Sequence, residues 1–211
     1  MARIGDPLTA VSWRTGWFCL TIRDRLAVDG QHVTVDLPEL SITVQNFRGA
    51  LRGYWNVCSH RGTQMREAGC GVGPLRCPYH GWVYNAHGIP IGIPDNDLLF
   101  GLDATARKRL ALRRVEVEIL GRLVFVRVDP GTEPLIEALG SRIEALAVTP
   151  ALGHRLLGTG DGPELEGVAE IRFRNLCIHG DHRASSVEIT LPAGNRGIEV
   201  ARFDFIAPSP E

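Results

Sequence analysis

Two short boxes, each pairing one cysteine with one histidine, constrain this chain more than any other feature. The first box, CSHRG, occupies residues 58–62 and has one residue between its cysteine and its histidine. The second, CPYHGW, occupies residues 77–82 and has two residues between them. Sixteen residues separate His60 from Cys77. A metal site shared by all four side chains needs backbone that bends sharply beside each pair, so we expect the boxes at the tips of two loops.

The donor set narrows the chemistry of such a site. Two thiolates and two imidazoles are the ligands of a Rieske-type [2Fe–2S] centre, in which two histidines replace two cysteines on one of the irons. Two other interpretations stay open. A zinc site with the same four ligands is one, but it usually has the spacing C-x2–4-C followed by H-x3–5-H, which the alternating order here does not match. Four unrelated buried residues are the other, since cysteine is often only a small core hydrophobe.

The two boxes and their surroundings resemble the Rieske domain of the ring-hydroxylating non-haem iron oxygenases, in their large (alpha) subunit, over residues 13–130. The resemblance implies a [2Fe–2S] cofactor in which Cys58 and Cys77 hold one iron. It implies that His60 and His80 hold the other iron.

The resemblance also implies that Trp82 and Tyr84 tune the cluster. High-potential relatives carry a serine two residues after the second histidine, and its hydroxyl donates a hydrogen bond to cluster sulfur. This chain has Trp82 at that position, whereas Tyr84 remains available as a donor. We therefore expect a reduction potential near the low end of the Rieske range, about −150 mV.

Short apolar runs with period-two alternation predict strands along most of the chain. Turn signals at residues 29–30 and 48–49 separate several of them, and Gly69, Gly71 and Gly73 predict a loop between the boxes. The predicted fold is mainly β: a Rieske-type antiparallel β-sandwich with cluster-binding loops, followed by one helix and a small remnant β-sheet. The strands are expected near residues 17–22, 33–35, 42–44, 51–57, 82–84, 115–119, 123–128, 168–173, 187–191 and 199–206.

Three segments follow from this pattern. Residues 1–130 form the predicted Rieske domain, and residues 131–167 a helix and a linker. Residues 168–211 are similar to part of the catalytic-domain sheet of the same oxygenases. The linker prediction rests on five glycines within residues 152–167. The helix prediction rests on apolar residues at helical spacing, namely Leu135, Leu139, Ile143 and Leu146.

A second metal site is harder to find. The family resemblance implies a catalytic iron held by two histidines and one carboxylate, with open positions for oxygen and substrate. The nearest candidates are His179, His182 and Asp204. Residues 178–183 read as a loop between strands and lack the helical surroundings that the family gives its iron ligands. The catalytic residues, and with them enzyme activity, therefore stay open at this point.

The expected function is electron transfer through a Rieske cluster that accepts electrons from a ferredoxin or a reductase. Arg61, Arg66 and Arg76 flank the boxes and predict either a solvated rim or a docking face for an acidic donor. One alternative is an active oxygenase, hydroxylating an aromatic substrate at a mononuclear iron. Another is a structural or iron-sensing scaffold. The family resemblance adds a homo-oligomer, a trimer, as a further expectation.

Composition excludes some partners. The formal net charge of −1 gives no sign of nucleic-acid binding. The first residues lack the apolar segment of a signal peptide, and no apolar run approaches the length of a membrane span. Beyond the boxes, Cys19, Cys70 and Cys177 leave an odd number, which argues against a disulfide framework. We expect a cytoplasmic protein.

Overall fold

A computed structural model describes most of the chain: residues 10–142, 155–159, 169–180, 184–192 and 198–206. The chain divides into two compact units, one formed by residues 24–117 and the other by residues 1–23 together with 118–211. The division into three consecutive segments that the sequence suggests stays a prediction. Among the described helices, none is both long and apolar enough to cross a membrane.

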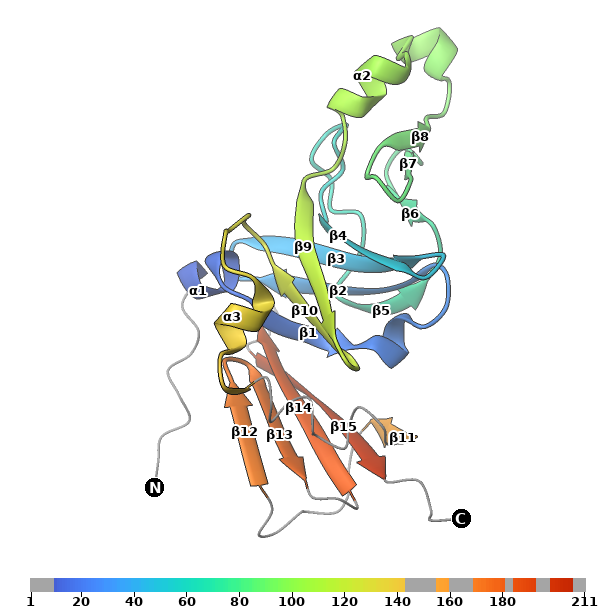
Figure 1. Cartoon of the computed structure of the whole chain (residues 1–211). Helices are drawn as coiled ribbons and strands as arrows, with labels where there is room; N and C mark the ends of the chain where they lie inside the picture. Colours follow the sequence, from blue (N-terminus) through green and yellow to red (C-terminus); the bar gives the residue numbers. More distant parts are fainter. Residues whose placement is uncertain (1–9, 143–154, 160–168, 181–183, 193–197, 207–211) are drawn as a thin grey trace. The chain divides into compact units, whose positions relative to one another are not determined.

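The unit of residues 24–117 is built on an antiparallel sheet in the order β9-β4-β3-β2-β5 (Figure 1). Arg48 and Gly49 connect β3 to β4, and both have positive φ angles, 52° and 90°. Tight hairpin turns favour such angles because their twist matches that of the strands. The strands are β2 (Gln31–Leu37), β3 (Leu40–Phe47), β4 (Ala50–Trp55), β5 (Gly69–Val72) and β9 (Arg114–Leu120), which continues beyond the unit.

A small antiparallel sheet in the same unit carries the second box. It consists of β6 (Leu75–Arg76), β7 (Val83–Tyr84) and β8 (Pro90–Gly92). A π-helical turn η2 (Asn96–Phe100) and the short helix α2 (Ala104–Arg109) follow β8. The Asp103 carboxylate accepts a hydrogen bond from the Ala106 N–H at 2.7 Å and so caps α2.

The structure corrects the predicted loop between the boxes, because β5 and β6 occupy much of it. Gly71 lies on β5 opposite His32 of β2. A Cβ atom on Gly71 would come within 2.8 Å of the His32 ring. This glycine therefore allows the His32 side chain to lie close to the backbone of β5. The sequence around it does not distinguish such a glycine from one in a turn.

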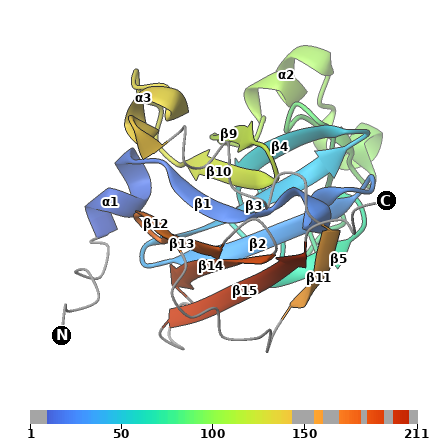
Figure 2. The same ribbon diagram turned by 60° about the horizontal axis from the view of Figure 1, so that its bottom comes forward.

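The second unit contains a strand pair and a sheet. β1 (Phe18–Ile22) pairs antiparallel with β10 (Leu123–Arg127). The sheet has the order β11-β15-β14-β13-β12, which Figure 2 shows side by side. Its strands are β11 (Arg155–Thr159), β12 (Ala169–Phe173), β13 (Leu176–Gly180), β14 (Ala184–Pro192) and β15 (Ile198–Ile206). The other elements are α1 (Ala10–Thr15), the 3-10 turn η1 (Arg23–Leu26), which crosses the unit boundary, and α3 (Leu135–Leu139).

The mainly antiparallel β architecture is confirmed, with two further local corrections. The predicted linker contains β11, whose pairing with β15 shifts register between Leu156 and Gly158. A glycine at a bulge interrupts the alternation that would otherwise reveal the strand. The predicted loop of residues 178–183 begins inside strand β13, which ends at Gly180. The predicted helix is present as α3 with Leu135 and Leu139 buried, while Ile143 and Leu146 lie outside the described residues.

Candidate metal centre

Both boxes fold into the same hydrogen-bonded turn. In the first box the Cys58 N–H donates to the Thr63 carbonyl at 2.8 Å, and the Gly62 N–H donates to the Cys58 carbonyl at 2.9 Å. Gly62 has a φ of 72°, a left-handed conformation that favours glycine. The turn therefore lifts Ser59, His60 and Arg61 to its tip.

The second box repeats this pattern residue for residue. The Cys77 N–H donates to the Trp82 carbonyl at 2.8 Å, and the Gly81 N–H donates to the Cys77 carbonyl at 3.1 Å. Gly81 has a φ of 71°. The two turns share a Cys-x-x-x-Gly frame and differ in where the histidine stands, at the third position in one and the fourth in the other. The common frame was visible in the sequence as a glycine four residues after each cysteine.

The two thiols lie together inside the unit. Cys58 and Cys77 are each 2% exposed and belong to one apolar core cluster. Burial raises the pKa of the Cys58 thiol, and the adjacent Cys77 thiol adds to this, while hydrogen bonds from Tyr84 and the His60 backbone oppose it. The core cluster consists of Tyr54, Cys58, Met65, Leu75, Cys77, Trp82, Tyr84 and Leu112.

The two imidazoles lie at the surface side of the same turns. The ring centroids of His60 and His80 are 4.9 Å apart. The His60 ring stacks on the Trp82 indole, with centroids 4.7 Å apart and planes 2° from parallel. Phe100 of η2 meets the His60 ring edge-on at 5.4 Å. Partial burial lowers the pKa of His60, and the neighbouring His80 and Arg61 lower it further.

Tyr84 connects the second box to the first. Its hydroxyl lies 3.1 Å from the Cys58 Sγ and accepts a hydrogen bond from the Ser59 N–H at 3.2 Å. The Ser59 Oγ is also 3.1 Å from this hydroxyl. The contact places the Tyr84 hydroxyl within hydrogen-bond distance of the sulfur, and its expected donor role stays a prediction. Ser59 is not among the residues that the sequence predicts. Its position directly after Cys58 was the only available signal.

This donor set fits a binuclear cluster. The four side chains form two pairs, buried sulfurs and more exposed imidazoles, and a [2Fe–2S] centre of mixed ligation takes two protein ligands on each iron. Among the residues that the structure describes, no three His, Cys, Asp or Glu side chains gather around a single ion position. A mononuclear Cys2His2 site would need all four side chains around one ion.

Comparison with known proteins decides the family of this site. Residues 16–103 match the model of the Rieske [2Fe-2S] domain. Residues 16–103 form a Rieske domain. The cofactor of that domain is a [2Fe–2S] cluster, so the cofactor prediction made from the two boxes is confirmed.

The chain also resembles oxygenase components beyond the two boxes. Over 128 residues it is 32% identical to the large oxygenase component of the 2,4-dinitrotoluene dioxygenase system of Burkholderia sp. (strain RASC), covering 59% of this chain and 28% of that protein. Over 129 residues it is 32% identical to the large oxygenase component of the naphthalene 1,2-dioxygenase system of Pseudomonas putida, with the same coverage. The matched stretch thus spans little more than a quarter of these relatives. The predicted family resemblance is confirmed.

Solved structures extend the likeness in fold to nearly the whole chain. A quaternary ammonium Rieske monooxygenase in complex with an inhibitor aligns with a TM-score of 0.69 at 15% identity, covering 96% of this chain and 71% of that one. A naphthalene 1,2-dioxygenase variant bound to phenanthrene aligns with a TM-score of 0.60 at 26% identity, covering 69% of this chain and 34% of that one. The predicted fold class is confirmed.

The three arginines around the Rieske boxes do not form one face. Arg61 and Arg76 are exposed. The Arg66 guanidinium instead donates inward, to the Gln45 Oε1 at 2.7 Å and the Pro74 carbonyl at 2.9 Å. Arg66 therefore does not belong to the predicted docking face.

The candidates for a second iron are spread over the C-terminal sheet. His179 lies on β13 and pairs with Ser186, which pairs with Asp204 of β15, so all three share one row. Neighbouring strands are about 4.8 Å apart, which puts the backbones of His179 and Asp204 roughly 10 Å apart. The Asp204 carboxylate accepts a hydrogen bond from Arg202 Nε at 3.0 Å. His182 lies outside the described residues, and the triad stays a prediction.

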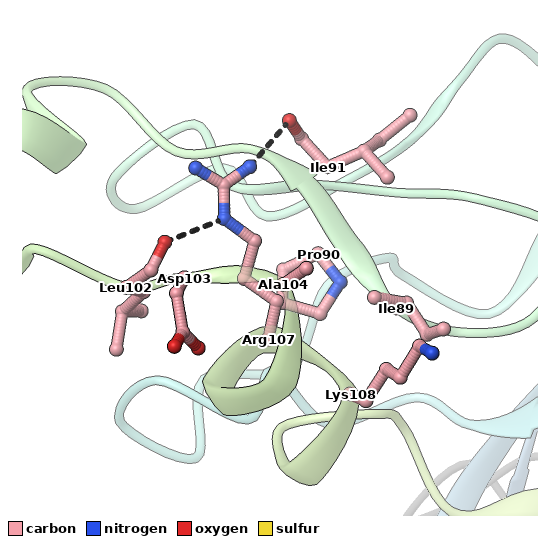
Figure 3. Close-up of a pocket in the computed structure, with 8 residues that line it drawn as sticks. All are labelled: Ile89, Pro90, Ile91, Leu102, Asp103, Ala104, Arg107 and Lys108. Carbon is pink, nitrogen blue, oxygen red and sulfur yellow. Dashed lines mark hydrogen bonds between the residues drawn. The ribbon is translucent and has the colours of Figure 1, made fainter.

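A pocket of about 390 Å³ lies between β8 and α2 (Figure 3). Its walls are mostly apolar, and the Arg107 guanidinium crosses it to donate to the carbonyls of Leu102 and Ile91, at 3.0 and 3.3 Å. These bonds tie the segment that follows the second box back to β8. The lining residues are Ile89, Pro90, Ile91, Leu102, Asp103, Ala104, Arg107 and Lys108.

Proposed function

We propose that this chain transfers single electrons through its Rieske cluster, as the electron-accepting part of an oxygenase-type system. The observation that carries the proposal is the pair of matching turns, which brings two buried sulfurs and two outward imidazoles to one place. When bound, a [2Fe–2S] cluster supplies one-electron transfer and the protein supplies its position and electrostatic environment.

In this proposal Cys58 and Cys77 hold one iron, and His60 and His80 hold the other. Burial of both thiols keeps water from the sulfur side. The Tyr84 hydroxyl lies 3.1 Å from the Cys58 sulfur. Once that sulfur is a deprotonated cluster ligand, the hydroxyl donates to it and spreads part of its negative charge. The Trp82 indole fixes the plane of the His60 ring by stacking against it.

The imidazole side is the proposed place of electron entry. His80 is exposed, and Tyr79 beside it is 61% exposed, with its ring centroid 3.9 Å from that of His80. Arg61 and Arg76 add positive charge near the two turns. A donor with acidic residues, such as a ferredoxin or a reductase, is attracted to this charge, and the attraction speeds encounter at low ionic strength.

Reconstitution under anaerobic conditions tests the ligand assignment. We expect about two irons and two sulfides per chain and the absorption and EPR spectrum of a mixed-ligand cluster. His80→Ala should lose that spectrum, whereas His87→Ala, an exposed histidine outside the boxes, should keep it. Equal cluster content in both variants would refute the assignment.

The electron-transfer role has a separate test. The rate of reduction by an acidic ferredoxin should fall as salt rises, and the double variant Arg61→Gln and Arg76→Gln should weaken that dependence. A salt-independent rate in the wild-type chain contradicts steering by these arginines.

Oxygenase activity is the second candidate, supported by the relatives, which are large oxygenase components of dioxygenase systems. It requires about one further iron per chain, held by two histidines and a carboxylate. Iron analysis therefore separates the two candidates: about two irons supports electron transfer alone, and about three supports a mononuclear site. An intact cluster that no donor reduces would point to a structural or sensing role instead.

A further inference from the structure

A polar network behind the first box includes the side chain of Arg66 and reaches the segment that leads to the second box. The network begins with Asn56, which is fully buried two residues before Cys58. Asn56 Nδ2 donates to the Arg66 carbonyl at 2.6 Å, and the Arg66 N–H donates to Asn56 Oδ1 at 3.1 Å. These reciprocal bonds close the base of the first turn and fix where the Arg66 side chain starts.

From that point the guanidinium extends along β3. Its Nη1 donates to the Thr43 Oγ1 at 3.3 Å, and its Nη2 donates to the Gln45 Oε1 at 2.7 Å. Thr43 and Gln45 are almost completely buried. Two polar residues of β3, which a period-two pattern assigns to solvent, are thus buried and hydrogen-bonded to this one guanidinium.

The same guanidinium reaches the segment that enters the second box. Its Nη2 lies 3.3 Å from the Gly73 carbonyl and 2.9 Å from the Pro74 carbonyl, three residues before Cys77. Gln45 Nε2 also donates to the Gly73 carbonyl at 3.2 Å, and the Gly73 N–H donates to the Gly30 carbonyl at 3.0 Å. The approach to the second turn is therefore held to β3 mainly through Arg66 and Gln45.

All four acceptors of this guanidinium are neutral oxygens. A planar fork with several fixed donors can bridge acceptors on two different segments, here β3 and residues 73–74, whereas a lysine ammonium offers one point charge. Burial lowers the pKa of Arg66 to about 10, so the group is still protonated at neutral pH. The side chain thus combines the geometry and the charge-assisted bonds that a clamp between loops needs.

We propose that Arg66 is a positioning residue that sets the separation of the two ligand-bearing turns. It joins the base of the first turn, strand β3 and the approach to the second turn in one hydrogen-bonded unit. The inference rests on the proposed assignment of both boxes to one cluster. Arg66 touches no candidate ligand, so it acts through the backbone on either side of them.

Three variants test the clamp. Arg66→Met removes both the fork and the charge, Arg66→Lys keeps the charge, and Gln45→Leu removes one acceptor and the second tie to Gly73. Arg52→Met is the control, because Arg52 is an exposed arginine of the same unit whose guanidinium donates to the adjacent Leu51 carbonyl. Circular dichroism establishes that each variant is folded, and if Arg66→Met does not fold, the other two variants decide the question.

The first measurement is amide hydrogen exchange of the two turns in the cluster-free chain. We expect Gly62 and Gly81 to exchange about tenfold faster or more in Arg66→Met, because one hydrogen bond to a charged group is worth that factor. If the planar shape of the guanidinium is required, the same two amides should exchange almost as fast in Arg66→Lys as in Arg66→Met. The second measurement is the EPR line width and the rate of cluster loss in reconstituted protein, which should rise in the same order.

The outcomes are distinct. If Arg66→Met matches Arg52→Met in exchange, line width and cluster loss, the clamp does not exist. If Arg66→Lys restores wild-type behaviour, the residue acts only as a charge and the positioning role is refuted. If the wild-type chain binds no cluster, the proposed function fails. The exchange measurement in cluster-free protein still tests whether Arg66 positions the two turns.

Discussion

The two units of this chain bury cysteines for different purposes. In the unit of residues 1–23 and 118–211, Cys19 is completely buried in an aromatic and aliphatic core, and burial raises its pKa far above the ordinary value. In the unit of residues 24–117, Cys58 and Cys77 are equally buried, but each opens a tight turn that carries a histidine. A cysteine that is only buried is thus a core residue, whereas a buried cysteine that begins a histidine-bearing turn is a candidate cluster ligand.

This contrast has a consequence for stability. The core of residues 24–117 contains the candidate sulfur ligands themselves, so a bound cluster and the fold of this unit depend on each other. The other core contains Phe173, Phe203 and Phe205 and none of the candidate cluster ligands. Its stability should not change when the cluster is lost.

Replacing a candidate sulfur ligand should give the largest effect. In Cys77→Ser we expect iron per chain to fall at least about tenfold, because a neutral hydroxyl does not replace a thiolate on the cluster. Amide exchange should rise in the unit of residues 24–117 and stay unchanged in β14 and β15. Cys70→Ser is the matched control, since Cys70 is exposed on β5. Loss of iron in both variants would contradict the assignment of Cys77 as a cluster ligand and of Cys70 as a cysteine that does not bind the cluster.

The opposite experiment removes a large side chain from the other core. Phe203 is completely buried on β15, so Phe203→Ala should lower the free energy of unfolding of its unit by about 3–5 kcal/mol. Val200→Ala on the same strand, where the side chain is exposed, should change it by less than about 0.5 kcal/mol. Denaturation followed by tryptophan fluorescence measures both. A changed EPR spectrum in Phe203→Ala contradicts the independence of the two cores.

The difference between local turns and contacts far apart in the sequence explains which features could be predicted from the sequence and which could not. The two boxes predict the family, the cofactor and the turns, because ligand type and spacing are local properties. The inward course of Arg66 is not local. A charged residue beside a loop is exposed by default, and the polar residues that alternate with Ile42 and Val44 suggest a wet face of β3. Thr43 and Gln45 are instead buried and accept hydrogen bonds from the Arg66 guanidinium, a contact between residues more than twenty positions apart in the sequence.

Removing the Tyr84 hydroxyl should act on the cluster more than on the fold. Tyr84→Phe deletes the hydroxyl that lies 3.1 Å from the Cys58 sulfur and that we propose donates to it, so the reduced cluster's added negative charge is less stabilised and the potential falls. One such bond is worth about 1 kcal/mol, or roughly 40 mV for one electron. Tyr54→Phe is the control, because the Tyr54 hydroxyl donates to the Ala86 carbonyl at 2.7 Å and not to a cluster ligand. Redox titration of both variants should shift only the first, and equal shifts would remove Tyr84 from cluster tuning.

The smallest effect should appear as a pH dependence confined to the unit of residues 24–117. Partial burial lowers the pKa of His32 below 6.5, and the nearby Arg66 lowers it further, while a hydrogen bond to the Gly30 carbonyl opposes both. The folded unit therefore binds a proton less readily than the unfolded chain. Its stability is complete above pH 6.5 and declines as the pH falls through 6.5 toward the lowered value.

His32→Gln should reduce that decline, to which His60 also contributes because its pKa is lowered as well. His87→Gln, which changes an exposed histidine of the same unit, should leave the decline in place. Arg66→Met should narrow the window without closing it, because burial is the larger cause of the shift and repulsion by the guanidinium the smaller. Urea denaturation between pH 5 and pH 8 measures all three variants. A decline of unchanged size in His32→Gln would show that His32 does not cause it. An unchanged pH window in Arg66→Met would show that the Arg66 charge does not affect the pKa of His32.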